Sequence, residues 1–208
     1  MSMSYKRPLD LSILVLSHLL LGPILILLWI LIPISILIMD GRPILFRQVR
    51  VGKDGYVFTM VKFRTMTNEP SKNAKHDITR LTIWGRFLRK TSIDELPVLL
   101  NVIKGDMSLV GPRPLPVKYL PRFNSFQRKR MTVKPGITGL AQVNGRNHLS
   151  WEQRFDFDID YIRKKSFFLD FFIIIKTLYL VIFLKNVSGK SQEIMPEFMG
   201  TDKNKDDI

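Results

Sequence analysis

The chain has 208 residues, which suits one modest catalytic or binding unit with a small appendage and excludes a large multidomain assembly. Lysine and arginine total 32 against 18 aspartates and glutamates, so the formal net charge of +14, together with 46% hydrophobic residues, excludes a disordered tail and indicates an anionic partner. The absence of cysteine excludes disulfides, a thiolate nucleophile and cysteine-based zinc sites, so carboxylates and basic side chains must carry any chemistry.

The first predicted element is a membrane segment. Residues 11–39 contain no charged side chain, and an unbroken helix of that length would extend roughly 43 Å, more than the ~30 Å hydrocarbon core of a bilayer requires. Pro23 follows Gly22 near the middle of the segment, and Pro33 lies further on. Each proline removes a backbone donor and clashes with the preceding turn, so we expect the helix to break or bend.

Basic residues flank this segment on both sides, with Lys6 and Arg7 before it and Arg42 after it. Because the cytoplasmic flanks of membrane segments are enriched in lysine and arginine, both ends are expected on the cytoplasmic side. A helix that enters the membrane, breaks at Gly22-Pro23 and returns satisfies both flanks, so residues 1–40 are predicted to form a re-entrant membrane hairpin. A single kinked spanning helix remains the alternative. A signal peptide is not expected, because no small-residue cleavage site follows.

A β-hairpin is expected next. The turn residues Gly52-Lys53-Asp54-Gly55 precede Val57–Phe63, a stretch of β-branched and aromatic residues that is typical of a strand. After a polar loop, residues 82–90 have the pattern of a short amphipathic helix or loop at the membrane surface.

The following helix is expected to begin close to Asp94, because Pro97 is tolerated only in a first helical turn. It is expected to end at Gly105. The apolar spacing i, i+3, i+4 and i+7 predicts its buried face. That face consists of Leu96, Leu99, Leu100 and Ile103. The adjacent carboxylates of Asp94 and Glu95 suit Mg²⁺ shared with a phosphate substrate, or an attack on phosphorus. From their spacing alone, a helix cap that interacts with the helix dipole is the preferred interpretation.

Basic residues and turns dominate the next part of the chain. Residues 113–134 contain seven basic residues and no acidic one. Residues 134–139 and 144–147 are rich in turn residues and are expected to be too irregular for the core. Irregular backbone with a few fixed polar groups is a usual place for ligand contacts.

Two further helices are expected before a polar tail. Ser150 or Asn147 is predicted to cap a helix over residues 150–161. Residues 167–184 are very apolar but include two charged residues, which favours a helix lying in the membrane interface, with a second spanning helix as the alternative. The sequence from Ser188 onward carries no signal of structure.

Four long motifs occur along the chain in a fixed order. They are Lys62–Met66, Ser92–Pro97 with Asn101-Val102, Lys104–Pro114 and Lys134–Asn147. In sequence and in order they resemble the bacterial sugar transferase family, whose members are small monotopic phosphoglycosyl transferases that begin the assembly of polysaccharides or glycans. The similarity covers roughly residues 6–184.

The resemblance implies an α+β fold in which a membrane-dipping helical hairpin precedes a small, mainly helical cytoplasmic catalytic domain with a short β-hairpin and interfacial amphipathic helices. The hairpin corresponds to residues 1–40, the catalytic domain to residues 41–187 and the polar C-terminal tail to residues 188–208. The expected location is the bacterial inner (cytoplasmic) membrane, with the catalytic domain on the cytoplasmic face. The chain departs from the family at Gly22-Pro23, where Ser-Pro is common, and in its additional Pro33.

The resemblance also implies a reaction. Asp94 would attack the β-phosphate of a UDP-sugar, expel UMP and hold the sugar phosphate until undecaprenyl phosphate accepts it. Glu95 would support Asp94 and a Mg²⁺ site shared by the two acids. The four further residues predicted to lie near the substrate phosphates are Lys62, Arg113, Arg146 and Asp158. A surface charge or a structural ion pair is the alternative for each of these four.

Two other functions are compatible with the same features. A non-enzymatic membrane anchor would use the basic surface to hold anionic inner-membrane lipid. A metal-dependent lipid phosphotransferase would use a ternary complex without a covalent step. Nucleic acid is not an expected partner, because the aromatic side chains are not interleaved with the basic ones. The similarity over residues 144–151 favours an N-acetylated amino sugar as the transferred group.

Overall fold

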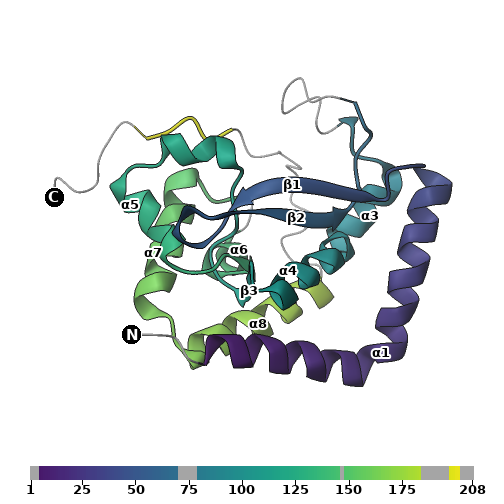
Figure 1. Cartoon of the computed structure of the whole chain (residues 1–208), viewed down its shortest axis with the longest axis horizontal. Coiled ribbons are helices and arrows are strands. Elements are labelled where there is room, and N and C mark those ends of the chain that lie inside the picture. Colours follow the sequence, from purple (N-terminus) through teal and green to yellow (C-terminus); the bar gives the residue numbers. More distant parts are fainter. Residues whose placement is uncertain (1–4, 70–78, 146–147, 184–196, 202–208) are drawn as a thin grey trace.

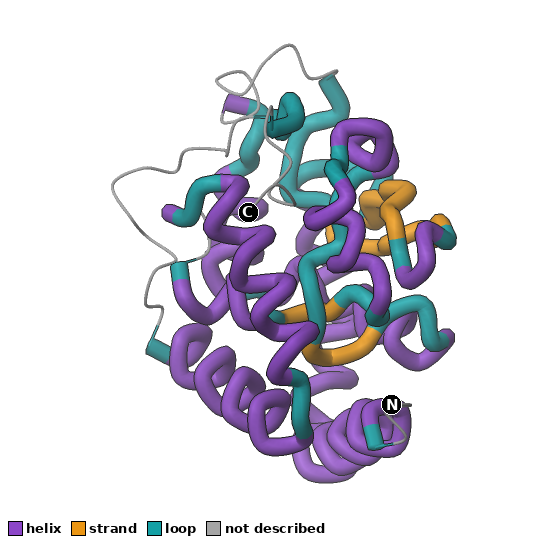
Figure 2. The backbone as a smooth tube through the Cα atoms, turned by 90° about the vertical axis from the view of Figure 1, so that its left-hand side faces the viewer, coloured by secondary structure: helices purple, strands orange, loops and turns teal. Residues whose placement is uncertain are grey.

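The computed structural model describes residues 5–69, 79–145, 148–183 and 197–201 (Figure 1). Helices make up most of this part of the chain, and the strands form two small two-stranded sheets. Figure 2 shows both pairs of strands flanked by helices. The predicted mixture of helices with a short β-hairpin is therefore confirmed.

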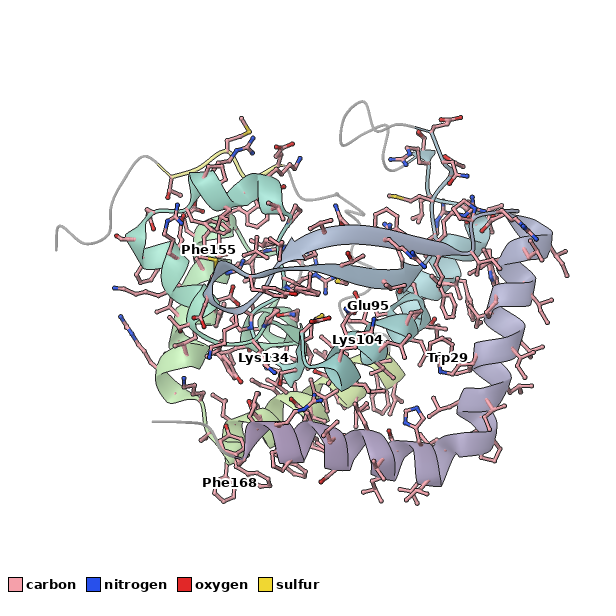
Figure 3. The ribbon with its side chains drawn as sticks, viewed as in Figure 1. Trp29, Glu95, Lys104, Lys134, Phe155 and Phe168 are labelled. Atoms are coloured by element: carbon pink, nitrogen blue, oxygen red, sulfur yellow. The ribbon has the colours of Figure 1, made fainter. Side chains whose placement is uncertain are left out.

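Helix α1 (Lys6–Met39) is the long apolar helix expected near the N-terminus, and it bends sharply (Figure 1). Its first limb follows the lower edge of the molecule in that view, and its second limb rises along one side. Trp29 lies on the second limb in Figure 3, so the bend precedes it, which agrees with the predicted break at Gly22-Pro23. Pro33 lies inside the second limb without ending the helix. The missing N–H of a proline and its clash with the preceding turn account for such a bend.

The protein contacts α1 mainly at its two ends. The buried residues of this helix are Asp10, Leu14, Ile32 and Ile36. Between them the apolar side chains are exposed, and only 11% of the most apolar stretch is buried. Among the described helices, α1 is the one long and apolar enough to cross a membrane. Its exposed apolar middle is therefore a surface that the described part of the protein leaves uncovered.

The predicted hairpin is formed by strands β1 (Leu45–Val51) and β2 (Val57–Phe63). The strands are antiparallel, with Leu45 opposite Phe63 and Val51 opposite Val57. The reversal uses left-handed backbone at Asp54 and Gly55, which have φ values of 53° and 81°. Such values suit Asp and Gly at a tight turn.

Arg64, directly after β2, ties the hairpin to the end of α1. Its guanidinium donates hydrogen bonds to the backbone carbonyls of Asp40, Gly41 and Arg42. The last carbonyls of a helix have no partner inside the helix, and a buried cation satisfies them well. Arg64 is 5% exposed. This contact fixes the second limb of α1 relative to the strand that carries Lys62.

Helix α3 (Ile83–Thr91) confirms the expected short helix, and its N-terminus is capped by the Thr82 hydroxyl. The next helix starts as the 3₁₀ turn η2 (Ile93–Val98) and continues as α4 (Leu99–Lys104). It ends at Gly105, which has a φ of 91°. The predicted start near Asp94 and the predicted end are both confirmed.

The predicted buried face of this helix is half right, since Leu96 and Leu99 pack against the core, and it is wrong for Leu100 and Ile103. Leu100 and Ile103 are 45% and 49% exposed, whereas Val98 and Val102 are buried. A 3₁₀ turn has 3.0 residues per turn and an α-helix has 3.6. Because the change falls between residues 98 and 99, one α-helical spacing cannot describe both sides of it.

Strands β3 (Ser108–Val110) and β4 (Gly136–Thr138) form a buried parallel pair. The expectation that residues 134–139 are too irregular for the core is therefore wrong. A Cβ atom at Gly136 would lie 2.1 Å from the backbone nitrogen of Gly111, so only glycine allows these two backbones to approach. A glycine inside a strand often marks such a close approach.

The rest of the described chain adds short helical elements and two longer helices. The short ones are η3 (Val117–Arg122), α5 (Ser125–Arg128), η4 (Lys129–Thr132) and α6 (Leu140–Asn144). Helix α7 (Trp151–Lys164) begins with a capping box in which the Ser150 and Gln153 side chains bond to each other's backbone, as the predicted cap requires. Helix α8 (Phe167–Ile182) has 16 residues and exposes apolar side chains such as Phe168, which is 81% exposed.

A buried ion pair joins the start of α1 to α8. Lys6 Nζ lies 2.7 Å from Asp170 Oδ2 and 2.8 Å from the Tyr161 hydroxyl. The Tyr161 hydroxyl donates to the other Asp170 oxygen at 2.8 Å. Asp170 is fully buried, which explains why a charge interrupts this apolar stretch.

The C-terminal segment 197–201 packs against the domain, although the sequence carries no signal for it. Phe198 is 1% exposed and belongs to an aromatic cluster with residues of η3 and α7. A single aromatic residue in a polar segment has no periodicity from which its burial can be predicted.

We predict that Asp170→Ala lowers the free energy of unfolding by about 3 kcal/mol or more, because it leaves the Lys6 ammonium without its buried partner. Asp160→Ala is the matched control, since Asp160 pairs with Lys164 at the surface and should cost less than about 1 kcal/mol. Denaturant or thermal unfolding in detergent measures both. Equal losses for the two variants would contradict a structural role for the buried pair.

Candidate functional site

The acids Asp94 and Glu95 lie in the turn η2, which packs directly against strand β2. Figure 3 shows Glu95 beneath the β1–β2 sheet, near the centre of the molecule. Ser92, with a left-handed φ of 58°, ends α3 and starts the turn. The site is thus built where a short 3₁₀ turn meets the end of the hairpin.

Two cations from different segments hold Glu95. Lys62 on β2 and Arg113 both donate to Glu95 Oε1, and the distance from Arg113 Nη2 is 2.9 Å. Burial alone would raise the pKa of Glu95, but the positive charges of Arg113 and Lys62 outweigh it and hold this pKa well below its usual range. Glu95 is therefore an ionised and fixed carboxylate.

Asp94 has a different environment. It is 7% exposed, and its carboxylate forms no hydrogen bond or ion pair with the residues that the structure describes. Burial, followed by the neighbouring charge of Glu95, raises the pKa of Asp94 to about 6. At neutral pH the group is mainly ionised, so Asp94 is a buried carboxylate that carries its charge without a direct partner among the described residues.

The loop that carries Arg113 is held at each of its residues. The Gly111 amide donates to Thr138 at 2.9 Å. The Pro112 carbonyl accepts from the Gly136 amide at 3.0 Å. The Arg113 carbonyl accepts from the Arg130 side chain at 2.8 Å, and the Pro114 carbonyl accepts from the Arg50 side chain at 3.0 Å. A backbone fixed at successive positions presents its side chain in one place, so Arg113 is preorganised.

A hollow opens beside Glu95. Its charged lining comes from Arg50, Lys62, Glu95 and Arg113, and its apolar lining includes Met60 and Met107. Three cations against one carboxylate give it an excess of positive charge. Lys62 and Arg113 already balance the charge of Glu95, so the excess positive charge favours an anionic group close to this hollow.

The structure places the other predicted site residues differently. Asp158 is 3% exposed and pairs with Arg130, with distances of 3.1 and 2.7 Å from Arg130 Nε and Nη2 to Asp158 Oδ2. Because Arg130 also donates to the Arg113 carbonyl, Asp158 lies behind Arg113 and acts on it through Arg130. Arg146 lies outside the described residues. The predicted phosphate contacts of all four residues stay predictions.

Arg50 and Arg130 support the loop that carries Arg113, and neither role was predicted from the sequence. Arg50 alternates with Val49 and Val51 on β1 and is half-buried. Arg130 lies in the basic run of residues 113–134, where nothing in the spacing separates a buried arginine from a surface one. For Arg50, the available signal was a charged residue between apolar neighbours in a strand. For Arg130 the sequence offered no such signal.

The acids suit a metal shared with substrate but not a complete protein cage. Among the described residues no group of three or more histidine, aspartate or glutamate side chains converges on a metal position. Mg²⁺ is usually bound by one or two carboxylates together with substrate phosphates and water. Asp94 and Glu95 are two carboxylates in one turn, and the Mg²⁺ site expected from them stays a prediction.

Comparison with known proteins gives a family for the chain's sequence. Residues 1–184 match the model described as bacterial sugar transferase. An uncharacterized sugar transferase, EpsL of Bacillus subtilis, is 50% identical over 163 residues, covering 77% of this chain and 81% of the relative. Two further relatives are an undecaprenyl-phosphate galactose phosphotransferase of Salmonella typhimurium, 37% identical over 197 residues, and a UDP-glucose:undecaprenyl-phosphate glucose-1-phosphate transferase of Klebsiella pneumoniae, 40% identical over 191. These matches cover 85% and 86% of this chain but only 40% of each relative.

Proposed function

The chain belongs to the bacterial sugar transferase family, and we propose that it moves a sugar 1-phosphate from a UDP-sugar to undecaprenyl phosphate. In this proposal Asp94 forms a covalent intermediate and UMP is released. The names of the Salmonella and Klebsiella relatives support both substrate classes. The reaction would be the first membrane step in assembling a glycan or polysaccharide.

The observation that carries this proposal is the contrast between the two acids. Lys62 and Arg113 hold Glu95, whereas Asp94, its neighbour in the same turn, has no partner among the described residues. A carboxylate that is ionised and unpaired is a competent nucleophile when nearby cations reduce its repulsion from a phosphate. The fixed Glu95 holds those cations beside Asp94.

The proposed reaction has two steps. An Asp94 oxygen attacks the β-phosphorus of the UDP-sugar, the bond from that phosphorus to the bridging oxygen breaks, and UMP leaves with the electron pair. An oxygen of undecaprenyl phosphate then attacks the same phosphorus and releases the Asp94 carboxylate. One site can thereby bind the soluble donor first and the membrane-bound acceptor afterwards. A ternary complex would have to bind both substrates at the same time.

Arg113 suits the phosphate-binding role proposed for it. One of its terminal nitrogens donates to Glu95, and 44% of its side chain is exposed. A guanidinium has five N–H donors in a planar fork, so the same side chain can hold Glu95 and bind a phosphate oxygen. Lys62 is less suited to bind a phosphate. Burial lowers the pKa of its ammonium, and the ammonium already donates a hydrogen bond to Glu95.

We predict that the purified protein releases UMP from at least one sugar in a panel of UDP-glucose, UDP-galactose and UDP-N-acetylated amino sugars. The resemblance over residues 144–151 favours the amino sugars, whereas the named relatives act on galactose and glucose. Asp94→Asn should lower the rate by on the order of 10³-fold or more. Asp160→Asn, at an exposed ion pair, is the control and should match the wild type. If no UDP-sugar releases UMP, the non-enzymatic anchor becomes the better account.

We propose Mg²⁺ as the cofactor, held by Asp94 and Glu95 together with the substrate phosphates. When bound, it would neutralise part of the charge that develops on the phosphates. Excess chelator should therefore abolish UMP release, and added Mg²⁺ should restore it. Full activity after dialysis against the chelator would exclude this role.

We propose that α1 enters the bilayer from the cytoplasmic side and returns to it, which places the catalytic domain on the cytoplasmic face. The bend and the exposed apolar middle of α1 support this arrangement. Single cysteines at Ser2 and at Tyr56, which is 68% exposed, should both resist an impermeant thiol reagent in intact cells and react after lysis. Because the chain has no native cysteine, labelling is specific. Labelling of Ser2→Cys from outside would establish a spanning helix instead.

A further inference from the structure

The C-terminal segment 197–201 docks on the catalytic domain although it lies beyond residues 1–184, the part that matches the family. The ring centroid of Phe198 lies 5.1 Å from that of Phe155 and 5.4 Å from that of Trp151. It also lies 5.9 Å from the rings of Tyr119 and Phe123. Phe198 is 1% exposed, whereas the adjacent Met199 is 75% exposed. The segment therefore buries one specific side chain.

Polar contacts hold the segment on both sides of Phe198. Glu197 accepts from Lys118 at 2.7 Å and from Arg122 at 2.8 Å. Thr201 accepts from Gln127 Nε2 at 2.8 Å. Gln127 is itself buried and belongs to a capping box, so Thr201 is attached to a side chain that the fold holds in place.

Arg130 packs against the same aromatic cluster as Phe198. The guanidinium carbon of Arg130 lies 5.9 Å from the Phe123 ring and 5.5 Å from the Phe155 ring. Arg130 is 7% exposed and donates to the Arg113 carbonyl at 2.8 Å. Cations over aromatic faces are stabilised most when the site is dry. The Phe198 ring packs against Phe123 and Phe155, so it helps to exclude water from the Arg130 guanidinium.

We propose that segment 197–201 is a strap whose docking fixes Arg130, and through Arg130 the backbone of Arg113, so that Phe198 is a positioning residue for the transfer. The path runs from the Phe198 ring through Phe155 to Arg130 and Arg113, and from there to Glu95. The effect on the reaction rests on the proposed function. The docking of segment 197–201 does not depend on the proposed function.

The test uses the full chain with Phe198→Ala, and with Met199→Ala as the matched control. In a background with Trp29→Phe and Trp84→Phe, Trp151 is the one remaining tryptophan and reports on the cluster. Phe198→Ala should shift its emission to the red and increase its quenching by acrylamide, whereas Met199→Ala should change neither. Unchanged Trp151 fluorescence in Phe198→Ala would overturn the docking.

The second readout is the kcat for UMP release at saturating UDP-sugar and undecaprenyl phosphate, measured well below the unfolding temperature. Loss of positioning should lower kcat on the order of 10- to 100-fold in Phe198→Ala, and Phe198→Leu, which keeps much of the apolar volume, should fall in between. In an Arg113→Ala background, Phe198→Ala should have no further effect, because the strap acts through Arg113. A red shift with unchanged kcat, or an additive loss in the double variant, would overturn the positioning role. If the wild type releases no UMP, the positioning role fails with the proposed function, and the fluorescence still decides the docking.

Discussion

One carboxylate oxygen holds the site together. Glu95 Oε1 accepts from both Lys62 and Arg113, so strand β2, the turn η2 and the loop 111–114 meet at a single atom. Removing one member of such a partly buried group leaves charge uncompensated, which typically costs several kcal/mol. Asp94 is placed by the backbone of the same turn without being paired itself. The turn thereby holds one paired and one unpaired carboxylate at adjacent positions.

Basic side chains also serve as internal supports elsewhere in the chain. Arg64 binds the carbonyls of Asp40 and Gly41 directly after α1, Arg7 binds those of Val102 and Ile103 at the end of α4, and Arg130 binds the carbonyl of Arg113. Arg64 and Arg7 attach α1 to the hairpin and to α4, and Arg130 holds the loop 111–114. Part of the net charge of +14 therefore acts inside the protein, so net charge alone overstates what remains for an anionic partner.

Local patterns predicted the local structure well. The turn before Val57, the proline in the first turn after Asp94 and the cap at Ser150 each specify an element through neighbouring residues, and all three are present. Contacts across the fold were not predictable, since Lys62 and Glu95 are 33 positions apart and no periodicity relates them. The three-residue strands β3 and β4 are too short for an alternating pattern, and the burial of Phe198 depends on a cluster assembled from distant segments. The family resemblance pointed to Asp94, Glu95, Lys62 and Arg113, and the structure places the last three in contact.

Trapping the covalent intermediate would show whether Asp94 is the nucleophile. The protein would be incubated with a UDP-sugar that releases UMP, without undecaprenyl phosphate, and its peptides analysed by mass spectrometry. If Asp94 is the nucleophile, the peptide that contains it gains one sugar-phosphate mass. This mass should be absent in Asp94→Asn and should be lost when undecaprenyl phosphate is added. A mass increase on another residue, or UMP release that occurs only when the acceptor is present, would contradict the claim.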